Sequence, residues 1–234
     1  TVGCVPYVNA IPLVYPFEAL GDESPVRVVY DVPSKLPALL ESGEAQAILV
    51  SIFDPLTVPG RSLVMGVGIG SDGPVQSVRL FSKKPLDAIE TLALDASSMT
   101  SNALAQIVLR ESYGVTPAYK TAKPDLASML ESFDACVLIG DAGMEAESNG
   151  LTVVDLGDAW KRLAGLPFVW AGCVGDQSLD VELAELLRNA CLEPSRLGIS
   201  STVEDWIRVA SKSSPFGVER LRDYYENAMR YEMD

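Results

Sequence analysis

The sequence contains no histidine among its 234 residues. Histidine is the usual general base at neutral pH, so its absence excludes Ser-His-Asp and Cys-His nucleophilic catalysis. The four cysteines form no CxxC pair and lie in apolar stretches, and we expect them to be buried hydrophobic residues rather than disulfide partners. Because a zinc site needs several thiolates or imidazoles at close spacing, no metal site is predicted.

Positive charge is also scarce. The chain has 18 Lys and Arg residues against 32 Asp and Glu residues, which gives a formal net charge of −14. Such a surface repels nucleic acids and anionic membranes, so neither is an expected partner. The first 77 residues contain only Arg27, Lys35 and Arg61 as cations. An anionic ligand would therefore be held there mainly by amide and hydroxyl donors and by helix N-termini.

Long hydrophobic runs are missing as well. No apolar run approaches the roughly 18 residues of a membrane span, and the N-terminus lacks the basic-then-apolar order of a secretory signal. We therefore expect a soluble, cytoplasmic protein. Because 48% of its residues are hydrophobic, the chain can bury the core of one large or two small domains. Nothing in the sequence indicates an oligomeric state.

The residues that are present follow the pattern of an α/β protein. Within the first fifty residues, three apolar strand signals alternate with two helix signals, which predicts a parallel sheet with its strand ends along one rim. Open α/β sheets bind ligands at the carboxyl ends of their strands. The polar residues that follow the strands are therefore candidate ligand contacts: Asn9, Ser34, which is also the predicted N-cap of the second helix, and Ser51.

Asn9 lies where the first strand ends and the first helix begins. Pro6 limits further strand pairing, and Pro12 suits the first turn of the following helix. An asparagine at such a junction is commonly a turn or cap residue that satisfies backbone groups. The alternative is an amide that faces a ligand at the strand end.

The same alternation begins again in the second part of the chain. We interpret residues 75–82 as a strand that crosses to a second lobe and residues 168–174 as the strand that returns. Beyond the return strand the chain is predicted to be wholly helical, with a capping box at Ser201 and Glu204. The pattern thus predicts two βαβ lobes joined by two crossing strands, with a cleft between them: lobe 1 formed by residues 1–77 and 171–234, and lobe 2 formed by residues 78–170.

Two turns of the second lobe carry polar groups at the start of a helix. The segment 95–102, DASSMTSN, places four hydroxyls at a helix N-terminus, including those of Ser98, Thr100 and Ser101. It is either an anion-binding turn or an N-cap with more hydroxyls than it needs. In the second turn, Gly140 permits close backbone approach and Asp141 is the predicted helix cap as well as a candidate contact.

Two further candidates lie at the predicted crossings. Ser77 is placed to face the ligand, although half of the side chains of a ribbon face elsewhere. Phe168 follows Gly-Leu-Pro and is a candidate wall of the cleft, while core packing is the more common role of a phenylalanine. Neither residue by itself indicates a reaction.

Six segments, in consistent order from about Val2 to Val174, carry a family resemblance: YVNAIPL, PSKLPALLESGEAQAILVS, SDGPVQSVRLFSKKP, ALDASSMTSNALAQIVL, VLIGDAGM and DLGDAWKRLAGLPFVWA. Together they resemble the chorismate dehydratase branch of the menaquinone-biosynthesis family of the futalosine pathway. The resemblance implies a type II periplasmic-binding-protein-like fold. It also implies conversion of chorismate to 3-[(1-carboxyvinyl)oxy]benzoate with loss of water and without a cofactor.

A sister branch with the same fold makes 1,4-dihydroxy-6-naphthoate and uses a histidine, which this chain lacks. The chain departs from the expected pattern at Ala164, where a threonine is usual, and at Phe53-Asp54, where a Ser-Glu-type ending is usual. The catalytic hypothesis is that Asn9 orients the leaving hydroxyl or stabilises developing charge, that Ser77 assists, and that the side-chain carboxylate of chorismate removes the proton. The expected substrate-binding residues are Ser34, Ser51, Ser98, Thr100, Ser101, Gly140, Asp141 and Phe168. The rival interpretation is a solute-binding protein of the same fold that performs no chemistry.

Overall fold

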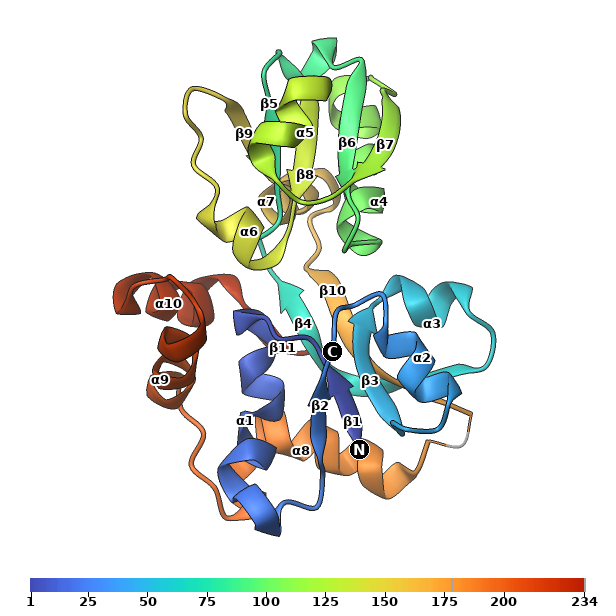
Figure 1. Cartoon of the computed structure of the whole chain (residues 1–234), viewed down its shortest axis with the longest axis vertical. Helices are drawn as coiled ribbons and strands as arrows, with labels where there is room; N and C mark the ends of the chain where they lie inside the picture. Colours follow the sequence, from blue (N-terminus) through green and yellow to red (C-terminus); the bar gives the residue numbers. More distant parts are fainter. Residues whose placement is uncertain (178, 234) are drawn as a thin grey trace. The chain divides into compact units, whose positions relative to one another are not determined.

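The structure, a computed structural model, describes residues 1–177 and 179–233 (Figure 1). The chain forms two compact units, a first unit of Thr1–Gly70 with Val169–Asp234 and a second unit of Ser71–Phe168. The chain therefore passes between the units at 70/71 and at 168/169. The sequence places these boundaries at 77/78 and 170/171. The first crossing therefore lies at the end of β4 (Arg61–Ser71), before the predicted strand 75–82.

The first unit is built on a six-stranded mixed sheet with the strand order β11-β4-β10-β3-β1-β2. β1 pairs in parallel with β2 and with β3, as the alternation of strands and helices predicts. β10 runs antiparallel to β3. The strands are β1 (Val2–Cys4), β2 (Val28–Tyr30), β3 (Ala47–Ser51), β4 (Arg61–Ser71), β10 (Phe168–Asp176) and β11 (Arg230–Glu232).

The helices of the first unit cover this sheet with their apolar faces. α1 begins as predicted near Pro12 and buries Leu13, Val14 and Phe17. It packs against α8 and α9 from the end of the chain. The helices are α1 (Ile11–Leu20), α2 (Leu36–Glu41), α3 (Phe53–Thr57), α8 (Val181–Leu192), α9 (Val203–Ser213) and α10 (Val218–Asp223).

The sequence predicts that the chain is wholly helical beyond the return strand. This prediction is wrong at residues 230–232, which form the strand β11. α10 continues into a single π-helical turn, η5 (Tyr224–Ala228), in which the Met229 N–H donates to the Tyr224 carbonyl at 3.1 Å. β11 follows and pairs antiparallel with β4. A strand of three residues gives too few alternations for the sequence pattern to reveal it.

The second unit is built on a five-stranded sheet with the order β7-β6-β8-β5-β9. β6 is parallel to β7 and β8, whereas β5 runs antiparallel to β8 and β9. The elements are β5 (Arg79–Ser82), β6 (Thr91–Asp95), α4 (Thr100–Tyr113), β7 (Ala118–Ala122), α5 (Leu126–Ser132), β8 (Ala135–Leu138), α6 (Gly140–Glu145), β9 (Thr152–Asp155) and α7 (Leu156–Ala164).

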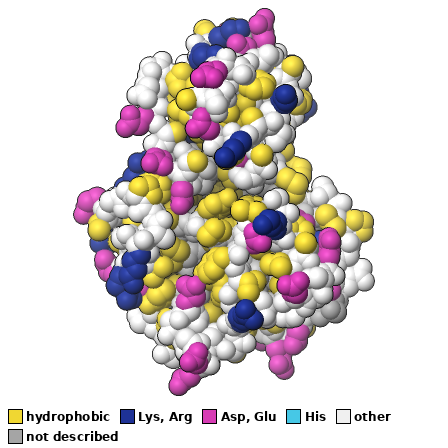
Figure 2. Space-filling model, in the orientation of Figure 1, with side chains coloured by type: hydrophobic (Ala, Val, Ile, Leu, Met, Phe, Trp, Pro, Cys, Tyr) yellow, Lys and Arg dark blue, Asp and Glu magenta, His cyan; other side chains and the backbone are white. Residues whose placement is uncertain are grey.

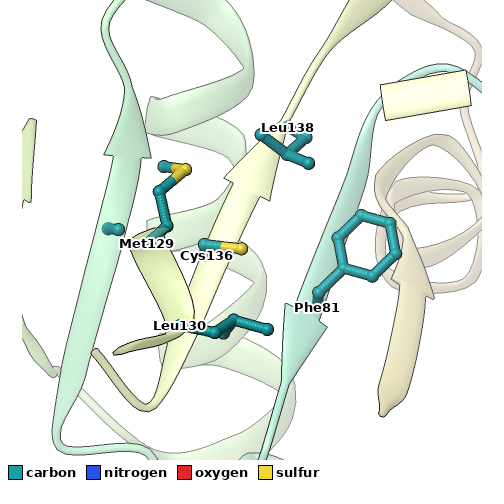
Figure 3. Packing of buried hydrophobic residues seen from close by; sticks show 6 residues of the cluster. Phe81, Met129, Leu130, Cys136 and Leu138 are labelled. Atoms are coloured by element: carbon teal, nitrogen blue, oxygen red, sulfur yellow. The ribbon is translucent and has the colours of Figure 1, made fainter. Parts of the chain in front are cut away.

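A compact apolar core holds the second unit together. Figure 3 shows Phe81 of β5, Met129 and Leu130 of α5, and Cys136 and Leu138 of β8 around one interior. Cys136 lies between Met129 and Phe81 in this view, and its small thiol packs as an apolar group. This packing fixes the register of the strands whose ends carry the polar turns described below.

The cysteines occupy the positions that the sequence predicts. All four are free thiols, and three of them, Cys4, Cys136 and Cys173, are buried. Burial raises the pKa of the Cys136 and Cys173 thiols to about 12, which keeps both protonated and unreactive. In the described residues no three His, Cys, Asp or Glu side chains gather in a group that could hold a metal ion.

Acidic and basic side chains are both seen on the face of the molecule shown in Figure 2. In Figure 2 the acidic side chains are scattered over the visible face rather than gathered in one patch.

Among helices of the described residues, none has the length and apolar character needed to cross a membrane.

The capping box of α9 is shifted by one residue from its predicted position at Ser201 and Glu204. The Thr202 hydroxyl accepts from the Asp205 N–H at 3.3 Å, and the Asp205 carboxylate accepts from the Thr202 N–H at 3.1 Å. Ser201 instead accepts a hydrogen bond from the Trp206 indole at 2.8 Å. The adjacent residues offer equivalent sequence signals, and the indole contact decides between them.

We expect the substitution Asp205→Asn to change the pH dependence of stability. The pKa of Asp205 lies below its ordinary value of 3.8. The hydrogen bond from the Thr202 hydroxyl is the largest cause, and the hydrogen bond from the Arg208 guanidinium is the second. Because the folded-state pKa is depressed, the stabilisation is present above the unfolded value and is lost as the pH falls through the folded one. Urea unfolding should show a deficit of the variant at neutral pH that shrinks below pH 3.8. A deficit that stays constant over this range would contradict the assignment.

Candidate functional site

Asn9 lies on a single 3-10 turn, η1 (Val8–Ala10), between β1 and α1. Its side chain does not cap either helix, because η1 and α1 begin without a side-chain cap hydrogen bond. The Asn9 Oδ1 atom is buried and has no hydrogen-bond partner among the described residues. A buried polar atom without a partner costs about 1–3 kcal/mol. The geometry thus argues against the cap interpretation of Asn9 and leaves its amide oxygen as a candidate ligand contact.

The other two candidates of the first unit follow the neighbouring parallel strands. Ser51 ends β3 and its hydroxyl accepts from the Phe53 N–H at 3.2 Å, at the start of α3. Ser34 is exposed in the turn after β2 and is not the N-cap of α2, so that prediction is wrong. The N-cap position is Lys35, which has helical dihedral angles and no side-chain cap bond. Because β1, β2 and β3 are parallel, the three candidates follow strand ends at the same edge of the sheet.

A buried ion pair lies just beyond Ser51 and was not predicted. Asp54 in α3 is 3% exposed, and its carboxylate lies 3.2 Å from the Arg61 guanidinium. Arg61 also reaches Glu41 at 3.2 Å. One of the three cations in the first 77 residues is therefore committed to a structural pair.

Ser77 is buried in a tight turn that precedes β5 and is not part of a ribbon, so the predicted strand 75–82 begins only at Arg79. The Ser77 N–H donates to the Val75 carbonyl at 2.7 Å, across Gln76, whose φ is 62°. A non-glycine residue at this φ is uncommon, and it persists only where neighbouring contacts hold it.

Asp155 at the end of β9 provides those contacts. Its carboxylate accepts from the N–H groups of Val75 at 3.0 Å and Gln76 at 2.7 Å. It also caps α7 by accepting from Gly157 at 2.9 Å and Asp158 at 3.1 Å. Burial raises the pKa of Asp155, while the four amide hydrogen bonds act in the opposite direction. One carboxylate therefore fixes both the Ser77 turn and the start of a helix.

Two glycines let helices approach this turn closely. A Cβ atom at Gly143 in α6 would lie 2.4 Å from the Ser77 carbonyl oxygen. A Cβ atom at Gly157 in α7 would lie 2.4 Å from the Gly73 carbonyl oxygen. Any larger residue at either position would displace the backbone around Ser77.

The hydroxyls of the segment 95–102 occupy different structural positions around the start of α4. The Ser98 hydroxyl is the effective cap of α4, since it accepts from the Ser101 N–H at 3.1 Å. The Ser97 hydroxyl donates to the buried Asp95 carboxylate, which also accepts from the Ile139 N–H at 3.2 Å. Thr100 and Ser101 are buried in the first turn of α4.

Gly140 and Asp141 form the first turn of α6. Gly140 has a φ of 57°, which favours glycine, and it is itself the first helical residue. Asp141 is the second residue of the helix and not its cap, so the predicted cap is wrong. The N-cap position is Ile139, and its side chain makes no cap bond. Its backbone N–H donates to the Asp95 carboxylate at 3.2 Å.

Phe168 begins β10 and is half-buried. Its ring packs edge-on against Trp160 of α7, with ring centroids 5.3 Å apart. The Trp160 indole donates to the Pro167 carbonyl at 3.2 Å, which fixes this aromatic pair. The contact is a packing contact within the second unit.

The polar turns of the second unit gather at one edge of its sheet. β6 and β8 are parallel neighbours, so the segment 95–102 and the Gly140 turn follow adjacent strand ends. β5 is antiparallel to β8, and Arg79 pairs with Leu138, which brings the Ser77 turn to that edge as well. The predicted residues thus form two groups, one at a sheet edge of each unit.

Comparison with known proteins shows to which family the chain belongs. The sequence profile described as menaquinone biosynthesis matches residues 1–234. The chain belongs to this family. It is 31% identical over 188 residues to a protein of Thermus thermophilus named chorismate dehydratase, covering 73% of this chain and 67% of that protein.

Solved structures show the fold of this family member. A protein from Archaeoglobus fulgidus superposes with a TM-score of 0.70 at 16% identity, over 95% of this chain and 85% of that one. The periplasmic aliphatic sulphonate binding protein of Escherichia coli superposes with a TM-score of 0.66 at 15% identity, over 98% and 84%. These likenesses confirm the predicted periplasmic-binding-protein-like fold.

We expect Asp155→Asn to destabilise the protein by about 2–4 kcal/mol, because an amide NH2 group would face backbone N–H donors that now share one carboxylate. Asp158→Asn is the matched control, since Asp158 lies in the same helical turn and pairs with Arg162 at the surface. That change should cost at most about 1 kcal/mol. Urea unfolding measures both, and equal small losses would contradict the role given to Asp155.

Proposed function

We propose that the chain is a chorismate dehydratase, which eliminates water from chorismate to give 3-[(1-carboxyvinyl)oxy]benzoate. The family match and the Thermus thermophilus relative support this assignment. The structural observation that supports it most directly is Asn9, whose Oδ1 atom is buried without a partner among the described residues; an acceptor of this kind suits a substrate hydroxyl.

The reaction is an elimination that leaves the substrate aromatic. The C–H bond at the ring carbon bearing the enolpyruvyl ether breaks, and its electron pair forms the new ring double bond. The C–O bond of the adjacent hydroxyl breaks, and the leaving oxygen departs as water with one added proton. No electrons are gained or lost overall, so the step needs neither an oxidant nor a reductant. We propose that it proceeds without a cofactor.

Asn9 and Ser77 are the proposed catalytic residues. The leaving hydroxyl donates to Asn9 Oδ1, which orients the C–O bond, and the amide NH2 stabilises charge as the bond breaks. Ser77 assists through a hydrogen bond to the substrate. Within its own unit, each side chain lies on a turn that distant residues hold in place before the substrate binds.

Hydroxyl and amide donors are proposed to bind the two carboxylates of chorismate. Thr100 and Ser101 lie in the first turn of α4, a helix of fourteen residues whose N-terminal N–H groups favour anions. The proposed contacts are Ser34, Ser51, Ser98, Thr100, Ser101, Gly140, Asp141 and Phe168. As expected of a biosynthetic enzyme of this family, we place the activity in the cytoplasm.

The side-chain carboxylate of the substrate is the proposed base. The chain has no histidine, and aromatisation provides a driving force large enough for a modest base. We propose no metal ion in this step, because the substrate itself supplies the group that takes the proton.

We expect the purified protein to convert chorismate, which is seen as the appearance of a benzoate-type ultraviolet spectrum. Asn9→Ala should lower kcat by about 10²-fold to 10³-fold, the loss typical of one preorganised hydrogen-bonding group. Asn227→Ala is the matched control, because Asn227 is exposed and its amide donates to the Asp223 carboxylate at 2.8 Å. Full activity of Asn9→Ala would refute the role of Asn9.

The same assay separates the enzyme from the rival solute-binding protein. An unchanged spectrum with the parental protein, together with tight binding of another small carboxylate in calorimetry, would favour the binding protein. An unchanged rate after dialysis against a chelator is expected for the cofactor-independent enzyme, and a loss that added metal restores would contradict that part.

The pH profile tests the proposed base. With a substrate carboxylate as base, kcat/KM should rise through the ionisation of that acid near pH ~4 and then stay level through neutrality. A clear inflection near neutral pH would contradict the proposal and indicate an Asp or Glu side chain of raised pKa.

A further inference from the structure

The turn that carries Asn9 is held by two tyrosines from the end of the chain. The Tyr225 hydroxyl donates to the Val8 carbonyl at 2.8 Å, across 217 residues of sequence. The Tyr231 hydroxyl donates to the Asn9 carbonyl at 3.1 Å, across 222 residues. Both contacts lie within the first unit. Two successive peptide groups of η1 are thus fixed from outside their own segment.

These tyrosines are themselves firmly held. Tyr225 belongs to the π-helical turn η5, and Tyr231 belongs to β11, which pairs with β4. Trp206 of α9 packs edge-on against both rings, with centroid distances of 5.6 Å to Tyr225 and 6.0 Å to Tyr231. The Trp206 indole is anchored in turn by Ser201 at 2.8 Å. Single π-helical turns occur frequently at functional sites, where they re-aim a side chain.

The chemistry of the contacts suits a permanent clamp. Burial raises the pKa of Tyr231 well above its ordinary value of 10.0, so its hydroxyl remains a donor across the working pH range. The Val8 carbonyl also accepts from the Ile11 N–H, which closes the 3-10 turn. Removing a tyrosine hydroxyl would remove one of the bonds that hold the turn, so the turn would open more often.

We propose that Tyr225 and Tyr231 are positioning residues that hold the Asn9 amide in the geometry needed for elimination. This inference rests on the proposed function, and it assigns the C-terminal segment a role in catalysis. The tyrosines themselves do not touch the substrate in this proposal. They act through the backbone of Val8 and Asn9.

The test uses Tyr225→Phe and Tyr231→Phe in the full chain, since each change removes a hydroxyl and keeps the ring that packs on Trp206. Each variant should lose about tenfold in kcat with chorismate, and KM should change little. In an Asn9→Ala background the same changes should cause no further loss, because the tyrosines act through Asn9.

The matched control is Tyr15→Phe. The Tyr15 hydroxyl accepts from Arg208 at 3.2 Å and joins α1 to α9 in the same unit, without contact to the Asn9 turn. This variant should keep the parental kcat. It reports what the loss of one hydroxyl between the N-terminal and C-terminal helices does by itself.

A second measurement does not depend on activity. Amide hydrogen exchange of Ile11, whose N–H closes η1, should accelerate in Tyr225→Phe and Tyr231→Phe but not in Tyr15→Phe. Unchanged exchange together with unchanged kcat would overturn the inference, and so would equal fold losses in the parental and Asn9→Ala backgrounds. If the parental protein does not convert chorismate, the proposed function fails, and with it the catalytic role of the clamp; the exchange result then shows separately whether the clamp holds the turn.

Discussion

Buried backbone groups need hydrogen-bond partners, and in this protein distant side chains supply them at the turns that carry the candidate site. Asp155 accepts from four amides, two of which belong to the turn before Ser77. Tyr225 and Tyr231 donate to the turn that carries Asn9. In both units a loop that would otherwise be mobile is tied to an element far away in the sequence. The proposed catalytic side chains are thus placed by residues that do no chemistry themselves.

The composition fits this design. A chain without histidine cannot use the usual neutral-pH base, and a chain with few cations near its N-terminus cannot bind anions by charge alone. The groups at the sheet edges are accordingly amides, hydroxyls and helix N-termini. Arg61, one of the few cations of that region, is committed to Asp54 and Glu41. In the proposed reaction, neutral donors that are held in place bind the substrate and aromatisation drives the elimination.

Several errors of the sequence-based prediction concern neighbouring residues with equivalent signals. Thr202 rather than Ser201 caps α9 because Ser201 bonds to the Trp206 indole. Asp141 does not cap α6 because the helix already begins at Gly140, which makes Asp141 its second residue. The strand β11 was missed because three residues show no periodicity, and its stability comes from pairing with β4. At α9 and β11 a tertiary contact decides what local propensity leaves open.

The sequence by itself determined the α/β class, the parallel order of β1, β2 and β3 and the burial of three of the four cysteines, because these follow from periodicity and hydrophobicity that are local to each segment. It also carried the motifs of the family to which the chain belongs. Only the tertiary structure decided that Asn9 Oδ1 is buried without a partner, that Gln76 is held at positive φ, and that Tyr225 reaches Val8. These features depend on contacts across tens to hundreds of residues, and no local pattern specifies which distant group will meet a given turn.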